Sequence, residues 1–157
     1  MKTLILMRHA NSDWPKPGQR DQERSLNATG LHEAARMGAW LRESGHIPQT
    51  ALISNAMRTR ETWGQMGIDC EAQFDDALYL AAAEDYLSAA QTAPECDCLL
   101  LLGHNPGMET AMGEFAGRRV SATTATTAVY SLPVRQWRDV KFKHGSLEAF
   151  ESPQSLA

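Results

Sequence analysis

Three apolar runs in this chain lead directly into Arg or His side chains, and this pattern constrains the fold more than any other feature. Each run has the length of a buried strand and is followed by polar residues typical of a turn. Residues at the carboxyl ends of parallel strands meet at one edge of a sheet. We therefore expect a single site there, built from two arginines and two histidines. The runs and their following residues are Leu4–Met7 with Arg8 and His9, Ala51–Ser54 with Arg58, and Leu99–Gly103 with His104.

Helical patterns alternate with the strand-like runs, which is typical of an α/β domain. The predicted fold class is α/β, a three-layer α/β/α sandwich with a mostly parallel sheet. The 157 residues suit a single domain over 1–157. The predicted strands are Lys2–Arg8, Thr50–Ser54, Ala72–Phe74, Cys98–Leu102, Ala128–Leu132 and an antiparallel Trp137–Lys143, and the predicted helices are Leu31–Ser44, Ala56–Met66, Ala81–Thr92 and Pro106–Ala116.

Composition narrows the class of partner. The formal net charge of -4 argues against broad binding to nucleic acid or to an anionic membrane, so any anion site must be local. No apolar stretch approaches the roughly 18 residues that a spanning helix needs, and no signal-peptide pattern follows Met1. The three cysteines are odd in number and predict reduced thiols rather than disulfides or a metal site. We expect a cytoplasmic protein without a metal or other cofactor.

The segment Asn11–Ser25 predicts a long loop, because its prolines, glycine and many charges show no helical or alternating period. A loop of this length in a compact domain is usually functional or mobile. Trp14 lies within it. We favour a packing role for the Trp14 side chain, holding the loop down, over a role as a substrate platform.

The residue types at the three strand ends suit a phosphoryl group. Such a group needs donors for three equatorial oxygens and a nucleophile in line with the leaving group. Arg8 and Arg58 can each offer a planar fork of N–H groups to phosphate. The helix start after Asn105 adds backbone N–H groups and the positive end of a helix dipole, so we include Asn105 among the phosphate-binding candidates. His9 is then the candidate nucleophile, since a neutral imidazole can form phosphohistidine, and a protonated His104 would stabilise charge.

Three motifs, in order along the chain, resemble those of the histidine phosphatase superfamily, the phosphoglycerate-mutase-like enzymes. Leu6–Ala10 is similar to the Arg-His-Gly signature, Ser54–Thr62 to the Ser-Pro-x-x-Arg-x-x-x-Thr motif, and Gly103–Gly107 to the third motif. Other segments resemble the SixA-like branch, the small protein-phosphohistidine phosphatases. These segments are Ser12–Trp14, Arg24–Leu26, Thr29–Gly30 and Asp76–Tyr79.

The resemblance covers the chain from Lys2 to about Leu132. It implies a phosphoglycerate-mutase-like α/β/α sandwich that acts without a metal. It also implies that His9 accepts the phosphoryl group. The residues that it implies for the phosphate pocket are Arg8, Arg58 and His104.

The chain departs from the family pattern at three places. Ala10 replaces the commoner Gly, and Asn55 replaces the Pro after Ser54. The third departure bears on the substrate: larger family members carry a Glu as general acid, whereas the matching stretch 78–81 has no carboxylate. Protonation of an alkoxide leaving group is worth about 10²–10⁴-fold. Phosphohistidine needs that help less, because imidazole leaves more readily, so the departure favours a phosphoramidate substrate.

The loop after His9 supplies the remaining candidates, Asp13, Asp21 and Arg24. The two aspartates are fallback acids, and the loop as a whole could contact substrate. An interpretation of equal weight is that both aspartates fix the loop by pairing with Arg20 or Arg24.

Three hypotheses follow. The leading one is a phosphatase that works through phosphohistidine on His9 and acts on protein phosphohistidine. The second is a small-molecule phosphomonoesterase, whose specificity the 11–24 loop would supply. The third is a catalytically idle module that binds phosphate or a phosphoprotein. Each hypothesis places phosphate or a similar anion in the pocket. All three depend on the conjunction of the four strand-end residues, because each alone is more often structural.

Overall fold

Six strands form one sheet in the order β3-β2-β4-β1-β5-β6 in the computed structural model, which describes residues 1–157. β4 pairs in parallel with β1 and β2, and β2 pairs in parallel with β3. β5 and β6 run antiparallel to their neighbours. The four parallel strands therefore end at one edge, as the sequence predicts. The strands are β1 Lys2–Arg8, β2 Thr50–Ser54, β3 Glu71–Asp75, β4 Cys98–Gly103, β5 Thr127–Leu132 and β6 Ser146–Glu151.

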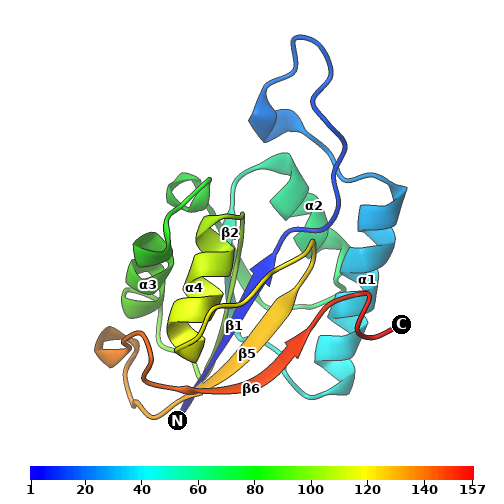
Figure 1. The fold of residues 1–157 in the computed structure, drawn as a ribbon. Coiled ribbons are helices and arrows are strands. Elements are labelled where there is room, and N and C mark those ends of the chain that lie inside the picture. The colour runs from blue at the N-terminus through cyan, green and yellow to red at the C-terminus, as the bar shows by residue number, and fades with distance from the viewer.

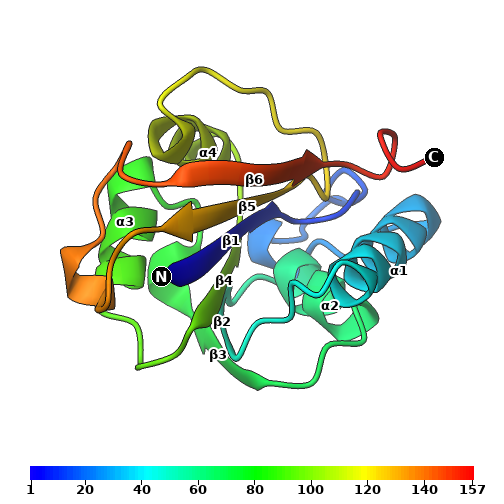
Figure 2. The same cartoon turned by 90° about the horizontal axis from the view of Figure 1, so that it is seen from below.

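Helices cover both faces of the sheet, so the predicted α/β/α sandwich is confirmed (Figures 1 and 2). One face carries α1 (Ala28–Glu43) and α2 (Met57–Gln65), and the other carries α3 (Ala83–Gln91) and α4 (Gly107–Ala116). None of these helices combines the length and hydropathy that a membrane span requires. Three 3₁₀ turns complete the elements: η1 Asp21–Glu23, η2 Asp76–Leu78 and η3 Trp137–Asp139.

The apolar run of β1 feeds two separate cores. Leu4 and Leu6 pack in the core beneath α3 and α4, whereas Ile5 and Met7 pack in the core beneath α1. Each of these four side chains is fully buried. A strand covered on both faces must be apolar at every position, which is why the sequence shows a continuous run rather than an alternation. β1 is thus held rigidly up to the point where Arg8 and His9 leave it.

The start of α1 holds the segment that follows His9. α1 begins at Ala28 rather than at the predicted Leu31, with Asn27 as its N-cap. The Asn27 side chain accepts a hydrogen bond from the Gly30 N–H at 2.9 Å and donates one to Asn11 Oδ1 at 2.6 Å. Gly30 packs so closely that a Cβ there would lie 2.0 Å from the Asn11 carbonyl oxygen. The helix start therefore fixes the chain at Asn11, three residues beyond the end of β1.

The prediction of a strand over Trp137–Lys143 is wrong. This segment contains η3 and irregular chain, and the last strand is β6. Trp137 is buried, and its indole N–H donates to the Cys96 carbonyl at 2.8 Å. The apolar residues of the segment close one end of the core beside α3. β6, the edge strand beside β5, is only partly buried, so its sequence shows a weak strand pattern.

Candidate active site

A pocket of about 580 Å³ lies at the carboxyl edge of the parallel strands. Arg8 is the last residue of β1, His9 follows it, Arg58 lies in the first turn of α2 after β2, and His104 follows β4. The structure brings all four predicted residues into this one pocket. The other residues that line it are Asn11, Ser12, Trp14, Asp21, Arg24, Tyr79, Leu80, Asn105 and Thr124.

His9 is held as a neutral imidazole with one nitrogen free. Its Nδ1 lies 2.7 Å from the Ala10 carbonyl oxygen, which can only accept, so Nδ1 carries the proton and Nε2 carries the lone pair. Burial, together with the positive charges of Arg58, Arg8 and Arg24, lowers the pKa of His9 to about 4 against the opposing effect of the Ala10 bond. At neutral pH, Nε2 is therefore available as a nucleophile.

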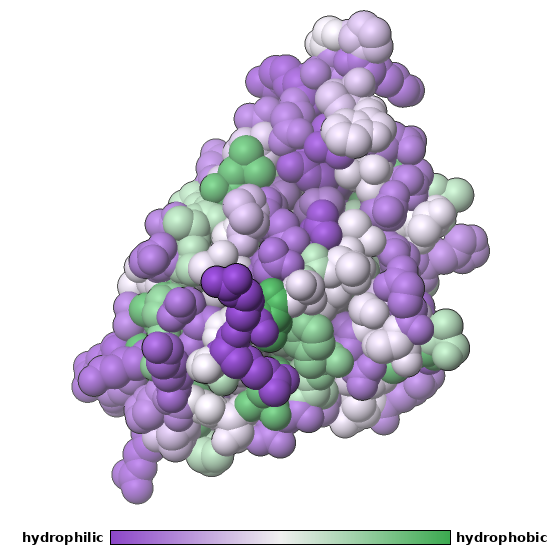
Figure 3. Space-filling view, viewed as in Figure 1, coloured by the Kyte–Doolittle hydropathy of each residue, from purple (hydrophilic) through white to green (hydrophobic).

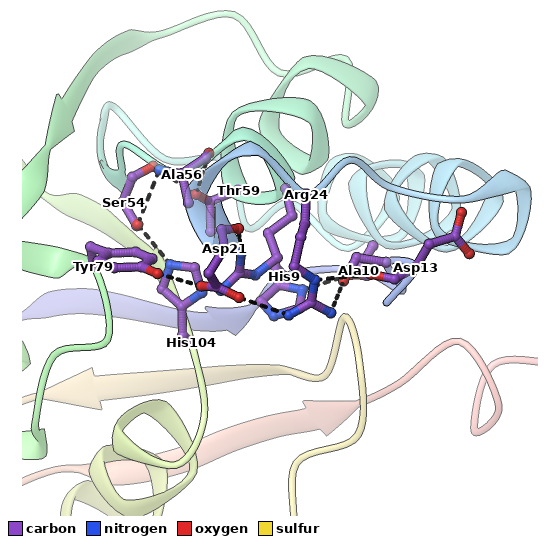
Figure 4. A network of polar contacts seen from close by, with 12 residues as sticks. His9, Ala10, Asp13, Asp21, Arg24, Ser54, Ala56, Thr59, Tyr79 and His104 are labelled. Carbon is purple, nitrogen blue, oxygen red and sulfur yellow. Dashed lines mark hydrogen bonds and ion pairs between the residues drawn. The ribbon is translucent and has the colours of Figure 1, made fainter. Parts of the chain in front are cut away.

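His104 lies beside His9, with ring centroids 5.3 Å apart. Its Nε2 hydrogen-bonds to Ser54 Oγ at 2.7 Å (Figure 4). Its backbone N–H donates to the Tyr86 hydroxyl at 3.0 Å. Burial, together with the neighbouring His9 and Arg58, lowers the pKa of His104 to about 3. The ring is thus neutral in the free protein, which differs from the protonated His104 considered from the sequence. Its Nδ1 has no partner within the chain.

Each of the two arginines uses terminal Nη atoms in hydrogen bonds and leaves its Nε without a partner. Arg8 Nη1 donates to the Ala122 carbonyl at 3.0 Å. Arg58 donates from Nη1 to the Asp21 carbonyl at 2.8 Å and from Nη2 to Asp21 Oδ2 at 3.0 Å. The Nε atoms of both arginines are buried without a partner. With His104 Nδ1 they are the three buried side-chain polar atoms in the chain that lack a hydrogen-bond partner. All three belong to residues of one pocket.

The second motif fixes these groups through its hydroxyl residues. Thr62 Oγ1 accepts a hydrogen bond from the Ala10 N–H at 3.1 Å and donates to the Arg58 carbonyl at 2.7 Å. Thr62 therefore ties the segment after His9 to the helix that carries Arg58. Thr59 Oγ1 donates to the Ser54 carbonyl at 2.7 Å, which closes the turn from β2 into α2. This turn forms with Asn55 in the place of the family's Pro.

Asp21 is the carboxylate nearest to the catalytic candidates. Its carboxylate accepts hydrogen bonds from Arg58 Nη2, from Arg24 Nη1 at 3.0 Å and from the Tyr79 hydroxyl. Burial acts to raise the pKa of Asp21, but the bonds from Tyr79, Arg24 and Arg58 outweigh it and hold this pKa well below its usual range. Asp21 is therefore ionised at neutral pH. Its place in the structure fits the loop-fixing interpretation and not a proton donor.

Arg24 lines the pocket and holds the loop by hydrogen bonds. Asp13 lies outside the pocket. Arg24 donates from Nε to the Asp13 carbonyl at 2.9 Å and from Nη2 to Ser12 Oγ at 3.1 Å. The Asp13 carboxylate accepts from Asn27 Nδ2 at 3.3 Å. These contacts fix the loop without help from Trp14, which is 88% exposed. The predicted packing role of Trp14 is wrong, because polar contacts of Arg24 hold the loop, and Trp14 instead lines the pocket.

Asn105 lies in the pocket, but its side-chain amide is engaged elsewhere. Its Nδ2 donates to the Ala122 carbonyl at 2.9 Å, and its Oδ1 accepts from the Glu109 N–H at 3.1 Å. Asn105 thereby caps the first turn of α4 and holds the carbonyl that also binds Arg8. The N–H of Glu109 is consequently not free for an anion.

Tyr79 is one of the pocket residues for which the sequence indicates no role. Its ring lies edge-on to His104 with centroids 5.5 Å apart, and its hydroxyl binds Asp21. Tyr79 follows β3 just as Arg58 follows β2, so its position after a fourth parallel strand is the signal that could have found it. The chain contains no group of three or more His, Cys, Asp or Glu residues arranged to hold a metal ion.

An α/β/α sandwich whose parallel strands end on two arginines and two histidines defines a class of phosphate-handling proteins. Residues 4–79 match the model of the histidine phosphatase superfamily (branch 1). An uncharacterized protein of Mycobacterium tuberculosis is 31% identical over 94% of this chain and 100% of its own length. The chain belongs to the histidine phosphatase superfamily, in its SixA-like branch.

Solved structures agree with this assignment. A protein of Nakamurella multipartitia assigned to the SixA phosphohistidine phosphatases superposes with a TM-score of 0.83 and 28% identity, over 97% of this chain and 96% of that one. The protein histidine phosphatase SixA, in complex with tungstate, gives a TM-score of 0.81 over 99% of both chains. The two sequences are 18% identical, so this comparison shows only that the two proteins share a fold. By class the protein is a phosphatase, and so a hydrolase.

Proposed function

We propose that this protein removes the phosphoryl group from phosphohistidine in proteins, through a covalent phosphohistidine on its own His9. The observation that carries the proposal is the set of three buried, unpartnered nitrogens beside the free Nε2 of His9. Arg8 Nε, Arg58 Nε and a protonated Nδ1 of His104 can each donate one hydrogen bond. A transferring phosphoryl group presents three equatorial oxygens, so donors and acceptors match in number.

The first step transfers the phosphoryl group to the protein. The lone pair of His9 Nε2 attacks phosphorus, and the bond from phosphorus to the substrate imidazole nitrogen breaks. The departing imidazole takes a proton from water. In the second step, water attacks phosphorus in phospho-His9, the bond from phosphorus to Nε2 breaks, and inorganic phosphate leaves with the oxygen of that water. The proton released by the water balances the proton consumed in the first step.

The ionisation of the pocket supports this mechanism. His9 is neutral because its pKa is about 4, so no base is needed to activate it. The negative charge of a bound phosphoryl group would raise the pKa of His104, because opposite charges stabilise each other. The Ser54 hydroxyl can accept from Nε2 as readily as it donates to it, so His104 can bind a proton without losing its partner.

The groups that line the pocket favour a phosphoramidate substrate over a phosphate monoester, because none of them is a strong proton donor for the leaving group. The backbone after η2 carries Tyr79 and Leu80 at the pocket, with no carboxylate. Asp21, the one carboxylate that lines the pocket, is ionised. An alkoxide leaving group would therefore depart without a strong proton donor, whereas imidazole needs less assistance. SixA binds tungstate, an oxyanion, which is consistent with anion binding in a pocket of this kind.

The test traps the intermediate. A peptide phosphorylated on its only histidine with labelled phosphoramidate should transfer the label to the protein. The protein-bound label should be acid-labile and alkali-stable, as a phosphohistidine is. His9→Ala should abolish labelling and turnover, whereas His32→Ala, a change at an exposed histidine of α1, should not. Labelling that survives in His9→Ala would overturn the mechanism.

Substrate choice is measured separately. We expect kcat/KM to be higher for the phosphohistidine peptide than for a phosphoserine peptide or a sugar phosphate. All three substrates are assayed over the same range of concentrations. A clear preference for a monoester would establish the small-molecule phosphomonoesterase instead. Absence of any phosphoenzyme, with phosphate still bound, would establish the idle binding module.

A further inference from the structure

A second hollow of about 530 Å³ adjoins the phosphate pocket. Tyr79 lines both and forms their common wall. The second hollow lies between η1, the start of α2 and η2, and the residues used below are Arg20, Glu23, Met57, Arg60 and Asp76. Together the two hollows extend well beyond the place where a phosphoryl group would contact His9, Arg8 and Arg58.

Charges in the second hollow are balanced within the chain. Arg20 pairs with Glu23 at 3.2 Å. Arg60 donates to Asn55 Oδ1 at 2.8 Å, and Asn55 Nδ2 donates to Asp76 Oδ1 at 2.8 Å. Two arginines and two carboxylates give no net charge among the lining residues. The second hollow therefore carries no excess positive charge for a second phosphate, whereas the first contains three buried nitrogens without a partner.

Exposed apolar side chains gather around both hollows. Seven large hydrophobic residues in the chain are exposed, and four of them lie here: Trp14, Met57, Phe74 and Leu80. Trp14 and Leu80 line the phosphate pocket, Met57 lines the second hollow, and Phe74 lies under the guanidinium of Arg60, with 4.2 Å from Cζ to the ring centroid. Figure 3 shows a strongly hydrophobic area at the foot of the protruding loop, among mostly hydrophilic surroundings. Solvent-exposed apolar surface of this kind marks an interaction site.

Leu80 lies at this surface in a strained backbone conformation. Its φ is +50°, in the left-handed region that leucine rarely adopts, and its side chain is 56% exposed. A non-glycine residue held in this region is strained. The neighbouring Ala81 carbonyl oxygen packs against Gly107, where a Cβ would lie only 1.8 Å away, so α4 holds the backbone in place. Burial in the chain's own core does not repay this strain, which points to a ligand contact.

We propose that this surface binds the polypeptide segment around the phosphorylated residue, with apolar side chains next to that residue packing on Leu80, Trp14 and Met57. The charges select this partner: one strongly cationic pocket takes one phosphoryl anion, and the surrounding surface is apolar and electrically balanced. A bisphosphate or a nucleotide would place additional negative charge beside residues whose own charges already balance. The proposal rests on the proposed phosphatase function and names the substrate segment that this function would use.

The test compares two peptides, each phosphorylated on a single histidine with phosphoramidate and identical except at the flanking residues. One peptide carries leucine on both sides of the histidine and the other carries serine. The wild-type protein should favour the leucine peptide in kcat/KM by about tenfold or more, since burying one such side chain is worth about 1.5–3 kcal/mol. The ratio of the two values cancels any general loss of activity.

Two variants should remove that preference. Leu80→Asn keeps a residue that tolerates the left-handed backbone and deletes the apolar contact. Met57→Gln deletes the contact in the second hollow. Each should bring the ratio toward one, whereas Ile47→Gln, an exposed apolar residue before β2 at the opposite edge of the sheet, should leave the ratio at its wild-type value.

The outcomes separate this inference from the function on which it rests. Equal kcat/KM values for the two peptides in the wild-type protein, or an unchanged ratio in both variants, would overturn the docking surface. If His9→Ala still abolished the phosphoenzyme in the labelling experiment described above, the proposed function would stand. Turnover retained in His9→Ala would instead overturn the phosphatase mechanism, whatever the peptide ratio.

Discussion

The Ser54 hydroxyl lies 2.7 Å from Nε2 of His104, and both side chains are almost completely buried. Serine can donate to a neutral imidazole and accept from a protonated one. When Ser54 donates to Nε2, the proton of the neutral ring must reside on Nδ1, the nitrogen without a partner in the chain. With Ser54 as the donor, His104 offers the N–H of Nδ1 to a bound anion.

Ser54→Ala should therefore lower kcat/KM by about 10- to 100-fold, because a buried ring nitrogen left unpaired costs about 1–3 kcal/mol. The measurement is hydrolysis of an artificial aryl phosphate. Ser88→Ala, on the exposed surface of α3, is the matched control and should be close to wild type. Full activity in Ser54→Ala would contradict the positioning role.

The imidazole of His9 should titrate near pH 4 instead of near 6.5. Burial is the main cause, and the guanidinium groups of Arg58 and Arg8 contribute. The check is an NMR pH titration of ring chemical shifts, with the signal assigned by its loss in His9→Gln. The same experiment should place Nδ1 as the protonated nitrogen, because it faces the Ala10 carbonyl. A titration midpoint above 6 would disprove the expectation.

Stability should fall as the pH is lowered from about 6.5 to about 4. In this window the unfolded chain protonates His9 and His104 readily, whereas the folded protein resists, since their pKa values are about 4 and about 3. The free energy of unfolding should decrease by up to about 1.4 kcal/mol per pH unit for each histidine. Urea denaturation at several pH values measures this slope, and His9→Gln should reduce it.

Asp21→Asn should weaken turnover of all substrates alike. The carboxylate holds Arg58, Arg24 and Tyr79, so its loss should misplace Arg58 and raise KM. Because Asp21 is ionised, it supplies no proton to a leaving group. In a series of aryl phosphates, the slope of log kcat/KM against leaving-group pKa should match that of wild type. A steeper slope would identify Asp21 as a general acid. Asp13→Asn, outside the pocket, serves as the control.

Gly103→Ala should destabilise the protein and disturb the site. A Cβ at Gly103 would lie 2.0 Å from the Tyr86 hydroxyl oxygen, which binds the His104 N–H. Overpacking of this kind costs about 1–3 kcal/mol. Gly64→Ala, in α2 with nothing within 4 Å, should instead be neutral or stabilising. The free energies of unfolding from urea titrations test both expectations.

Local sequence is sufficient to predict the core of the fold. The strands Lys2–Arg8 and Thr50–Ser54 have the bounds that their apolar runs predict, because residues buried on both faces must be apolar throughout. Parallel pairing then brings the carboxyl ends together, so the pattern of strands and helices is enough to assign Arg8, His9, Arg58 and His104 to one edge. The order of residues along the chain encodes that much directly.

Other features depend on contacts between segments far apart in sequence. The ionisation of Asp21 depends on Tyr79, which is 58 residues away, and the tautomer of His104 depends on Ser54, which is 50 residues away. Trp14 looks like an anchor in the sequence, yet the polar contacts of Arg24 leave it exposed. The sequence alone determined which groups reach the strand ends, since strand periodicity is local. Only the tertiary structure decided which group partners which, because side-chain direction and loop position are set by packing across the whole domain.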